Sequence, residues 1–153
     1  MNPDTARNRF TELEGGDPVD HRRVEAFFDD CGPLDIDDII GEWRGAPLRT
    51  GHKGVAQLDG LDWYGKVFRS RFDITPVACR DASGRLTDRH GYGGAGLWRV
   101  EFRGVVSLSL VYDRHPIVDH FRRVDEDTLI GVMDGGPDLL DEGKHFYFSL
   151  RRR

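Results

Sequence analysis

The sequence predicts a mainly β protein, a small antiparallel barrel of about eight strands that follows one or two short N-terminal helices. Short apolar runs of strand-forming residues recur at turn-separated spacing from Trp43 to the C-terminus. The 19 glycines are spread between these runs, which favours β structure over a helical bundle. A closed sheet also protects short strands from edge-to-edge pairing, and we therefore expect a barrel rather than an open sheet.

Two helical segments are expected before the strands. Residues 17–30 place apolar side chains along one side of a helix, which ends at Gly32-Pro33. These side chains are Val19, Val24, Phe27 and Phe28. A short helical turn is expected at residues 35–40, and residues 46–62 are consistent with either an irregular loop or a short helix.

The strand candidates are bounded by glycine, proline or charged turn residues. They are residues 41–45, 64–69, 75–80, 97–103, 105–112, 117–124, 129–134 and 145–151. In the last of them Phe146, Phe148 and Leu150 share one face, and we expect that face to point into the core. A barrel of about eight strands is just wide enough to hold one small ligand, so the fold itself suggests a pocket.

The composition bounds the domain organisation and the partners. A chain of 153 residues with 38% hydrophobic and 32% charged residues is expected to form one domain, which we place at residues 17–153 behind a flexible N-terminus at residues 1–16. The formal net charge of −5 argues against nucleic acid as a partner. Because no membrane-spanning run and no secretory signal are visible, we expect no membrane span and a location in the cytoplasm.

The hairpin at residues 111–134 carries an unusual number of ionisable side chains on strand-forming sequence. Successive side chains of a strand alternate, so Asp119 and Phe121 share one face while His120 and Arg122 share the other. A charge on a partly buried face is costly unless it is paired. Either ion pairs close inside the sheet, or these residues line a site.

Three residues are the candidate catalytic groups: His120, Asp119 and Tyr112. Histidine titrates near neutral pH, and a carboxylate can orient it or raise its pKa. Neighbours along a strand do not face one another, so His120 would need Tyr112, Glu101 or Asp134 from adjacent strands. The alternative is a histidine that packs structurally with one hydrogen bond.

Lys66 is the leading candidate for ligand binding. If its strand face points inward, Lys66 is a buried cation suited to a ligand carboxylate or a Schiff base; if outward, it is an ordinary solvated lysine. The full set of ligand-binding candidates is Lys66, Arg122, Tyr64, Trp63, Phe68, Trp98 and Phe102.

Other chemical signatures are weak, and we expect no metal and no cofactor. His115 and His120 lie five residues apart, which puts them on opposite faces of a continuous strand. The G-x-G-x-x-G pattern at residues 91–96 precedes a strand, whereas a dinucleotide site needs it between a strand and a helix. Cys31 and Cys79 are in no metal spacing and are expected to be small buried residues.

Three separated blocks resemble a bacterial family. The segment GEWRG at residues 41–45 matches the motif that names the GXWXG domain, and WYGKVF at residues 63–68 resembles that domain's second signature. The stretches YD, PIVDHFR and GVMD within residues 112–134 resemble the companion domain of unknown function, family 4334. The resemblance covers roughly residues 35–151 and implies a fold but no function.

A looser similarity points to calycin barrels, which include lipocalins and fatty-acid-binding proteins. These place G-x-W on the first strand, where the tryptophan closes one end of the barrel and stacks with an arginine from the last strand. Here Trp43 and Arg151 or Arg152 would take those parts.

The function that we expect is binding of a small hydrophobic molecule, with a carboxylate or carbonyl group, in the barrel pocket. One alternative is a cofactor-free isomerase, cyclase or lyase with His120 or Asp119 as base and Tyr112 or Lys66 as acid. A second is a protein-interaction module whose polar hairpin is a surface. Enzymatic activity, ligand identity and a homodimer all remain open at this stage.

Overall fold

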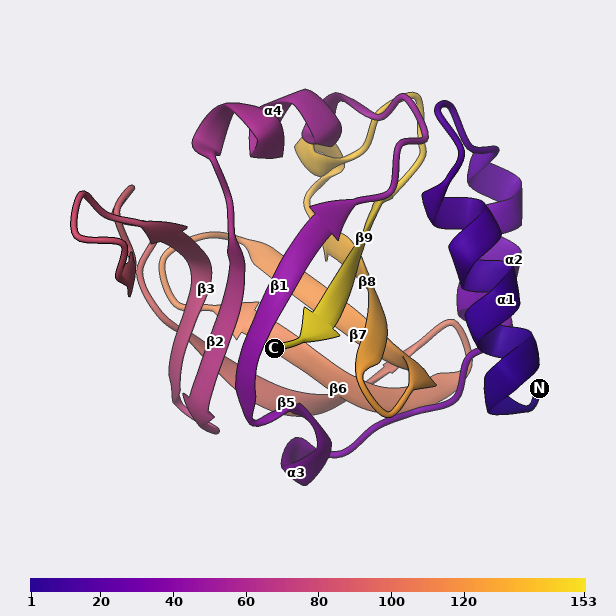
Figure 1. Ribbon diagram of the computed structural model, residues 1–153, viewed down its shortest axis with the longest axis horizontal. Helices are drawn as coiled ribbons and strands as arrows, with labels where there is room; N and C mark the ends of the chain where they lie inside the picture. Colours follow the sequence, from indigo (N-terminus) through magenta and orange to yellow (C-terminus); the bar gives the residue numbers. More distant parts are fainter.

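The computed structural model describes residues 1–153 and contains one curled antiparallel sheet of nine strands (Figure 1). The elements in chain order are α1 (Pro3–Glu14), α2 (His21–Asp30), α3 (Ile36–Ile39), β1 (Gly41–Pro47), α4 (Lys53–Leu61), β2 (Gly65–Ser70), β3 (Asp73–Arg80), β4 (Leu86–Thr87), β5 (Ala95–Phe102), β6 (Val105–Tyr112), β7 (Ile117–Asp125), β8 (Thr128–Gly135), the 3-10 turn η1 (Pro137–Leu139) and β9 (Phe146–Arg152). The order of strands in the sheet is β4-β3-β2-β1-β9-β8-β7-β6-β5.

The sheet curls until its two halves face one another across an interior. Lys66 on β2 contacts Tyr112 on β6 and Asp119 on β7, although β1, β9 and β8 separate β2 from β7 in the sheet. The N–H group of Leu97 in β5 donates to the carbonyl of Arg71, beside β3, at 3.0 Å. No strand ladder joins β4 to β5, so the barrel stays open on that side. The predicted mainly β fold is confirmed, and the additional strand is the two-residue β4.

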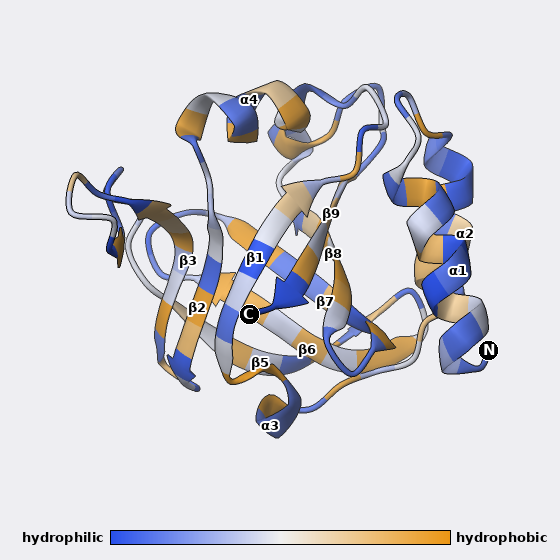
Figure 2. Cartoon of the chain, viewed as in Figure 1, coloured by the Kyte–Doolittle hydropathy of each residue, from blue (hydrophilic) through white to orange (hydrophobic).

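Two hydrophobic cores lie on the two faces of the sheet. The inner core fills the curl and contains Trp43, Phe68, Phe121 and Phe148 among its 17 buried residues. The outer core of 13 buried residues lies where α1 and α2 pack against the outer side of β7, β8 and β9 (Figure 1). Strands β7, β8 and β9 therefore alternate between two buried environments. Figure 2 shows hydrophobic and hydrophilic residues mixed along the strands.

The GXWXG segment has a direct packing explanation. Trp43 is fully buried, its indole N–H donates to the carbonyl of Ile39 at 2.7 Å, and the guanidinium of Arg152 lies 4.3 Å from the ring centroid. This is the stacking of a first-strand tryptophan on a last-strand arginine that the sequence suggests. A Cβ atom on Gly45 would lie 2.1 Å from the ring of Trp63. The second glycine of the motif therefore leaves the space that Trp63 occupies.

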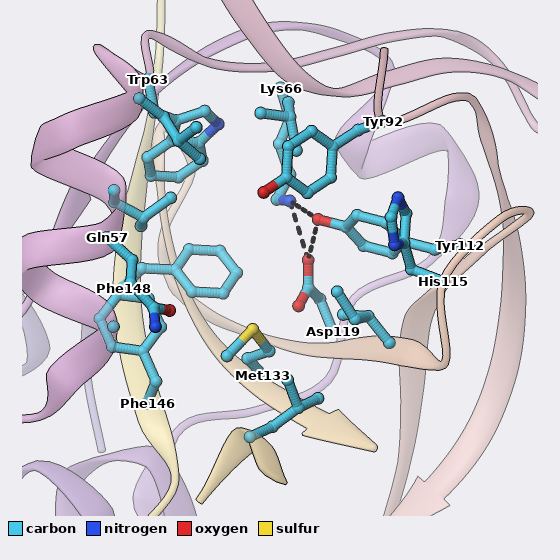
Figure 3. Close-up of a pocket in the computed structure, with 16 residues that line it drawn as sticks. Gln57, Trp63, Lys66, Tyr92, Tyr112, His115, Asp119, Met133, Phe146 and Phe148 are labelled. Atoms are coloured by element: carbon cyan, nitrogen blue, oxygen red, sulfur yellow. Dashed lines mark hydrogen bonds and ion pairs between the residues drawn. The ribbon is translucent and has the colours of Figure 1, made fainter. Parts of the chain in front are cut away.

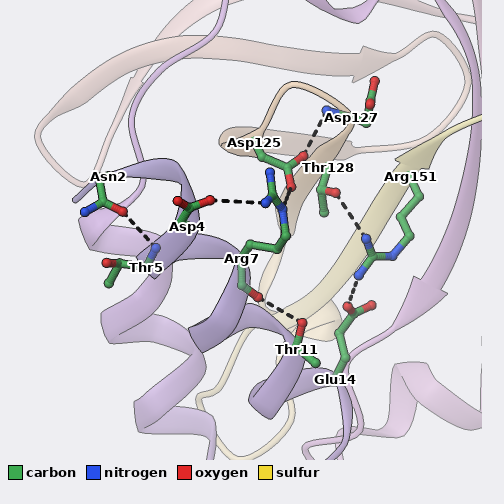
Figure 4. A network of polar contacts seen from close by, with 10 residues as sticks. All are labelled: Asn2, Asp4, Thr5, Arg7, Thr11, Glu14, Asp125, Asp127, Thr128 and Arg151. Carbon is green, nitrogen blue, oxygen red and sulfur yellow. Dashed lines mark hydrogen bonds and ion pairs between the residues drawn. The ribbon is translucent and has the colours of Figure 1, made fainter.

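Helix α1 replaces the flexible N-terminus that the sequence predicts for residues 1–16. Ala6, Phe10 and Leu13 are spaced as one helical face and are buried against the outer core. Polar contacts add to this packing, and Figure 4 shows Arg7 bridging Asp4 and Asp125 while Glu14 pairs with Arg151. The sequence predicts a flexible segment here because only three apolar residues of this polar helix are buried.

The remaining helices lie close to their expected places. Helix α2 begins at His21 with Asp20 as its N-cap, four residues after the start of the helical segment expected at residues 17–30. Helix α4 lies in the segment that the sequence leaves undecided, and it crosses one end of the curled sheet (Figure 1). None of the helices combines the length and the hydrophobicity that a membrane crossing requires.

Candidate functional site

A cavity of about 260 Å³ lies inside the curled sheet, next to α4 (Figure 3). Eleven of its sixteen lining residues are hydrophobic. The lining residues are Gly54, Gln57, Leu58, Leu61, Trp63, Lys66, Val77, Tyr92, Tyr112, His115, Ile117, Asp119, Met133, Leu139, Phe146 and Phe148. Aromatic rings and one methionine make up much of the wall, which suits an apolar ligand with few polar groups.

One buried polar cluster interrupts this apolar lining. The ammonium nitrogen of Lys66 lies 2.8 Å from Oδ2 of Asp119 and donates to the hydroxyl of Tyr112 at 2.9 Å. The same hydroxyl donates to Oδ2 of Asp119 at 3.2 Å. All three residues are at most 9% exposed. We call Lys66, Tyr112 and Asp119 the inner cluster.

The positive charge of Lys66 is well compensated. In addition to Tyr112 and Asp119, its ammonium donates to the carbonyl of Pro76 at 3.3 Å. Three oxygen atoms thus surround a group that carries three hydrogens. The rings of Trp63, Tyr112 and Phe148 lie 5.3 to 5.6 Å from the nitrogen, within the range of cation–π attraction.

The hydrogen bonds of the inner cluster leave one carboxylate oxygen of Asp119 without a donor. Burial, and then the carboxylate of Asp119, raise the pKa of Tyr112 well above its usual value, so the phenol keeps its proton and donates it to Asp119. Both contacts of Asp119 are to Oδ2. Its other oxygen, Oδ1, accepts no hydrogen bond and points toward the space bordered by Phe148 and Met133 (Figure 3).

The polar groups nearest to solvent lie at the edge of the cavity. Gln57 on α4 is exposed, and Tyr92 and His115 are partly buried. The rings of Tyr92 and His115 pack with centroids 5.0 Å apart. The side chain of Asp88 accepts from the N–H groups of Tyr92 and Gly93, which fixes the glycine-rich loop beside the cavity.

The structure brings four of the sequence candidates together at this cavity. Lys66, Tyr112 and Asp119 form the inner cluster, and Trp63 is part of the wall. The inward orientation of Lys66 settles the question that the sequence leaves open about its strand. Phe68 belongs to the same core but does not line the cavity.

His120 lies on the opposite, outer face of the sheet. Its Nδ1 atom is 2.6 Å from the hydroxyl of Ser109, and Nε2 is 3.0 Å from Asp134, which also contacts His145 at 3.4 Å. Its ring stacks on Phe102 with centroids 4.0 Å apart. Burial lowers the pKa of His120 more than the Asp134 carboxylate raises it. We call Ser109, His120 and Asp134 the outer cluster.

The outer cluster has the residue types of a hydrolytic triad but offers a substrate no access. Ser109 is only 1% exposed, and the stacked ring of Phe102 covers the histidine. Phe102 and His120 therefore pack together away from the cavity, which corresponds to the structural alternative for this histidine.

Arg122 also lies on the outer face, where it supports α2. Its guanidinium donates to the carbonyls of Phe28, Cys31 and Phe102 at 3.3, 3.2 and 2.9 Å, and it packs over the ring of Phe28. The first two carbonyls are at the C-terminal end of α2, where helices leave carbonyl groups short of partners, and the Phe28 carbonyl also accepts from the N–H of Cys31 at 3.2 Å. Arg122 thus satisfies backbone groups and has no contact with the cavity.

The other two ligand-binding candidates lie at the molecular surface. Tyr64 is surrounded by Arg44, Arg80 and Arg153, each within 6.0 Å of its ring centroid. Trp98 is 48% exposed and packs beside Phe72 and Arg71.

Several lining residues escape the sequence prediction. They are Tyr92, His115, Met133, Phe146, Phe148 and the α4 residues Gln57, Leu58 and Leu61. The predicted inward face of the last strand is the signal for Phe146 and Phe148. Met133 lies on β8. No local signal indicates the rest, because they come from loops and from a helix whose position depends on tertiary packing. Both cysteines are free and buried, as predicted, and burial raises the pKa of Cys31 to about 12.

Comparisons with known proteins agree with the motif evidence. The family described as GXWXG protein matches residues 26–84, and the Domain of unknown function (DUF4334) matches residues 93–152. A crystal structure of a protein from Thermomonospora curvata is 36% identical with a TM-score of 0.85, over 97% of this chain and 99% of that chain. This chain belongs to the GXWXG–DUF4334 family. No curated protein matches it.

In this GXWXG–DUF4334 protein the two matched segments build one site. Lys66 and Trp63 come from the GXWXG segment, while Tyr112 and Asp119 come from the DUF4334 segment. Strand β1 pairs with β2 on one side and with β9 on the other, so one continuous sheet spans both segments. The cavity therefore requires both.

Proposed function

We propose that this protein binds a small apolar molecule in the cavity of the curled sheet. The observation that carries the proposal is a cavity of about 260 Å³ whose apolar wall is interrupted by one buried polar cluster. Small-molecule sites commonly combine such a lining with a few polar groups that fix orientation. Since a cavity of about 150 Å³ accommodates benzene, this one suits a ligand of roughly ten non-hydrogen atoms.

The cost of the inner cluster supports a role in binding. A buried ion pair is often no more stabilising than apolar residues of similar volume, because both charges lose their hydration. Lys66 and Asp119 are therefore poorly explained as stabilising elements of the core. Their position in the cavity wall gives them a use as the polar end of a binding site.

A pair of matched substitutions tests the binding function. Ile117 lines the cavity, whereas Val106 is 56% exposed on β6, and both are β-branched strand residues. We expect naphthalene, with ten carbon atoms, to bind the unmodified protein in a calorimetric or NMR titration. Ile117→Trp fills the cavity and should abolish this binding, while Val106→Trp should leave it intact. Equal binding by both variants, or none by the unmodified protein, contradicts the proposal.

A second candidate function is a cofactor-free isomerase, cyclase or lyase. The observation that favours it is a carboxylate with a free oxygen beside the phenol of Tyr112, which is a suitable arrangement for a general base. Asp119 would take this role, since His120 faces the other side of the sheet. The ketone 2-tetralone, incubated in D₂O, should then exchange its acidic C–H protons faster with protein than without. An exchange rate that the double variant Lys66→Met/Asp119→Leu leaves unchanged argues against this function.

The protein-interaction alternative has less support. It rests on a polar hairpin at the surface, but Asp119, His120 and Arg122 are each at most 5% exposed. These three charged side chains are consequently turned to the two cores.

A further inference from the structure

The hydrogen-bond donors of the inner cluster are already engaged. The Lys66 ammonium faces the oxygens of Pro76, Tyr112 and Asp119, and the Tyr112 hydroxyl proton is directed at Asp119. A ligand that approaches from the cavity thus meets no free donor in this cluster. A carboxylate or carbonyl ligand, which needs a donor, would have to break an existing contact.

The free group of the inner cluster is an acceptor. Oδ1 of Asp119 has no hydrogen-bond partner in the protein, and the residue is only 2% exposed where it lines the cavity. A buried acceptor that lacks a partner is costly, and the cost is greater for a charged group. A ligand that donates a hydrogen bond to this atom would remove the cost.

The charges of the cluster restrict the ligand further. Lys66 and Asp119 together are neutral. A ligand carboxylate would add an uncompensated negative charge beside Asp119, and an ammonium group would leave a net positive charge in an apolar cavity. A neutral donor adds one hydrogen bond and no charge.

We infer that the ligand is a small apolar alcohol or phenol whose hydroxyl group donates a hydrogen bond to Oδ1 of Asp119. The inference rests on the proposed binding function and specifies its ligand class. The sequence predicts a carboxylate or carbonyl ligand instead. It identifies Lys66 as a candidate buried cation but does not show that Asp119 neutralises its charge.

Four ligands of one skeleton test this assignment on the full-length protein. They are 2-naphthol, 2-methylnaphthalene, 2-naphthoate and 2-naphthylmethylamine. A methyl group replaces the hydroxyl at nearly equal size, and the last two compounds carry the two charges. We expect 2-naphthol to bind at least about tenfold more tightly than each of the others. The reason is that a hydrogen bond to a charged group is stronger than one between two neutral groups.

Variants identify the atom that reads the hydroxyl. The double variant Lys66→Met/Asp119→Leu removes both charges together, and it should fold and lose the preference for 2-naphthol over 2-methylnaphthalene. Ser109→Ala, in the outer cluster, should retain that preference. A preference that survives in the double variant but disappears in Tyr92→Phe would assign the hydroxyl to Tyr92 and overturn the inference.

The outcomes separate this inference from the function on which it rests. If 2-methylnaphthalene binds and 2-naphthol gains nothing over it, or if 2-naphthoate binds most tightly, the alcohol assignment fails while the binding function stands. If 2-naphthylmethylamine binds most tightly, the inference that the ligand is neutral also fails. If no compound of the series binds, the proposed function itself fails.

Discussion

The two faces of one hairpin carry polar clusters that differ in what they leave unsatisfied. In the inner cluster, Asp119 pairs with Lys66 and Tyr112 and keeps one free oxygen beside a cavity. In the outer cluster, both ring nitrogens of His120 have partners, and no residue of the cluster lines the cavity. Asp119 and His120 are neighbours in the chain, so the alternation of the strand alone assigns them to different environments.

This difference shows that burial and hydrogen bonding alone do not mark a functional group. His120 and Arg122 are as deeply buried as Asp119, yet their contacts are to backbone and side-chain groups of the fold. Only the inner cluster combines burial with an unused acceptor that faces empty space. The comparison therefore predicts that substitutions in the outer cluster alter stability, and that substitutions in the inner cluster alter both stability and ligand binding.

The largest effect is expected from breaking the inner ion pair. Lys66→Met leaves the Asp119 carboxylate buried without its counter-charge, and this should lower the free energy of unfolding by about 3–5 kcal/mol. Asp119→Leu should have a similar effect through Lys66. Urea denaturation at neutral pH measures both.

The double variant Lys66→Met/Asp119→Leu is the matched control for these substitutions. Because it removes both charges together, it should recover most of the stability that either single variant loses. A double variant whose loss equals the sum of the two single losses would show that the pair does not interact as described.

The next effect concerns the buried charge of the outer face. Arg122→Leu removes the charged donor that the carbonyls of Phe28, Cys31 and Phe102 share, although the Phe28 carbonyl keeps the N–H of Cys31 as a partner, so we expect a loss of about 2 kcal/mol. The loss is smaller than for Lys66 because the abandoned groups are neutral. Naphthalene affinity of the folded variant should be unchanged, and a clear decrease would mean that the two faces are coupled.

The sequence predicts the mainly β fold but does not predict the helix at the N-terminus. Period-two patterns identify the strands, since each strand places apolar residues on a buried face. The curl is not visible in these patterns, because it depends on which distant strands pack together. Helix α1 is missed since its apolar face consists only of Ala6, Phe10 and Leu13 in a polar segment.

For the site, the sequence identifies those residues whose orientation follows from the alternation of side chains along a strand. Lys66 and Asp119 are flagged as charges on strand sequence, and the alternation correctly separates Asp119 from His120. Their mutual contact is missed because 53 residues separate them in the chain and only the curl brings β2 to β7. Tyr92 and the α4 residues depend on loop and helix placement, for which the local sequence holds no comparable signal.

The outer cluster should make stability depend on pH. Burial, the largest influence, lowers the pKa of His120 below its ordinary value of about 6.5, although Asp134 and Asp119 oppose this. The folded state then binds fewer protons than the unfolded state below about pH 6.5, so stability falls as the pH falls through this range. His120→Asn should reduce the drop in melting temperature between about pH 7.5 and 5.5.

Other groups define the control for this pH effect. Burial also lowers the pKa of His21 and His52, so the substitution of His120 removes only part of the slope. His21→Asn should likewise remove a part of the slope. An unchanged slope in His120→Asn would show that this histidine titrates alike in the folded and unfolded chains.

The smallest effect is expected at the exposed contacts of α1. Arg7 is 57% exposed and pairs with Asp4 at 3.3 Å and with Asp125 at 3.1 Å (Figure 4). Exposed pairs contribute about 1 kcal/mol or less, so Arg7→Ala should lower the unfolding free energy by no more than this and leave ligand affinity unchanged. The difference should shrink in about 1 M salt, which screens surface charges. A loss as large as that of Lys66→Met would mean that the polar contacts, rather than the buried face with Phe10, hold α1 on the sheet.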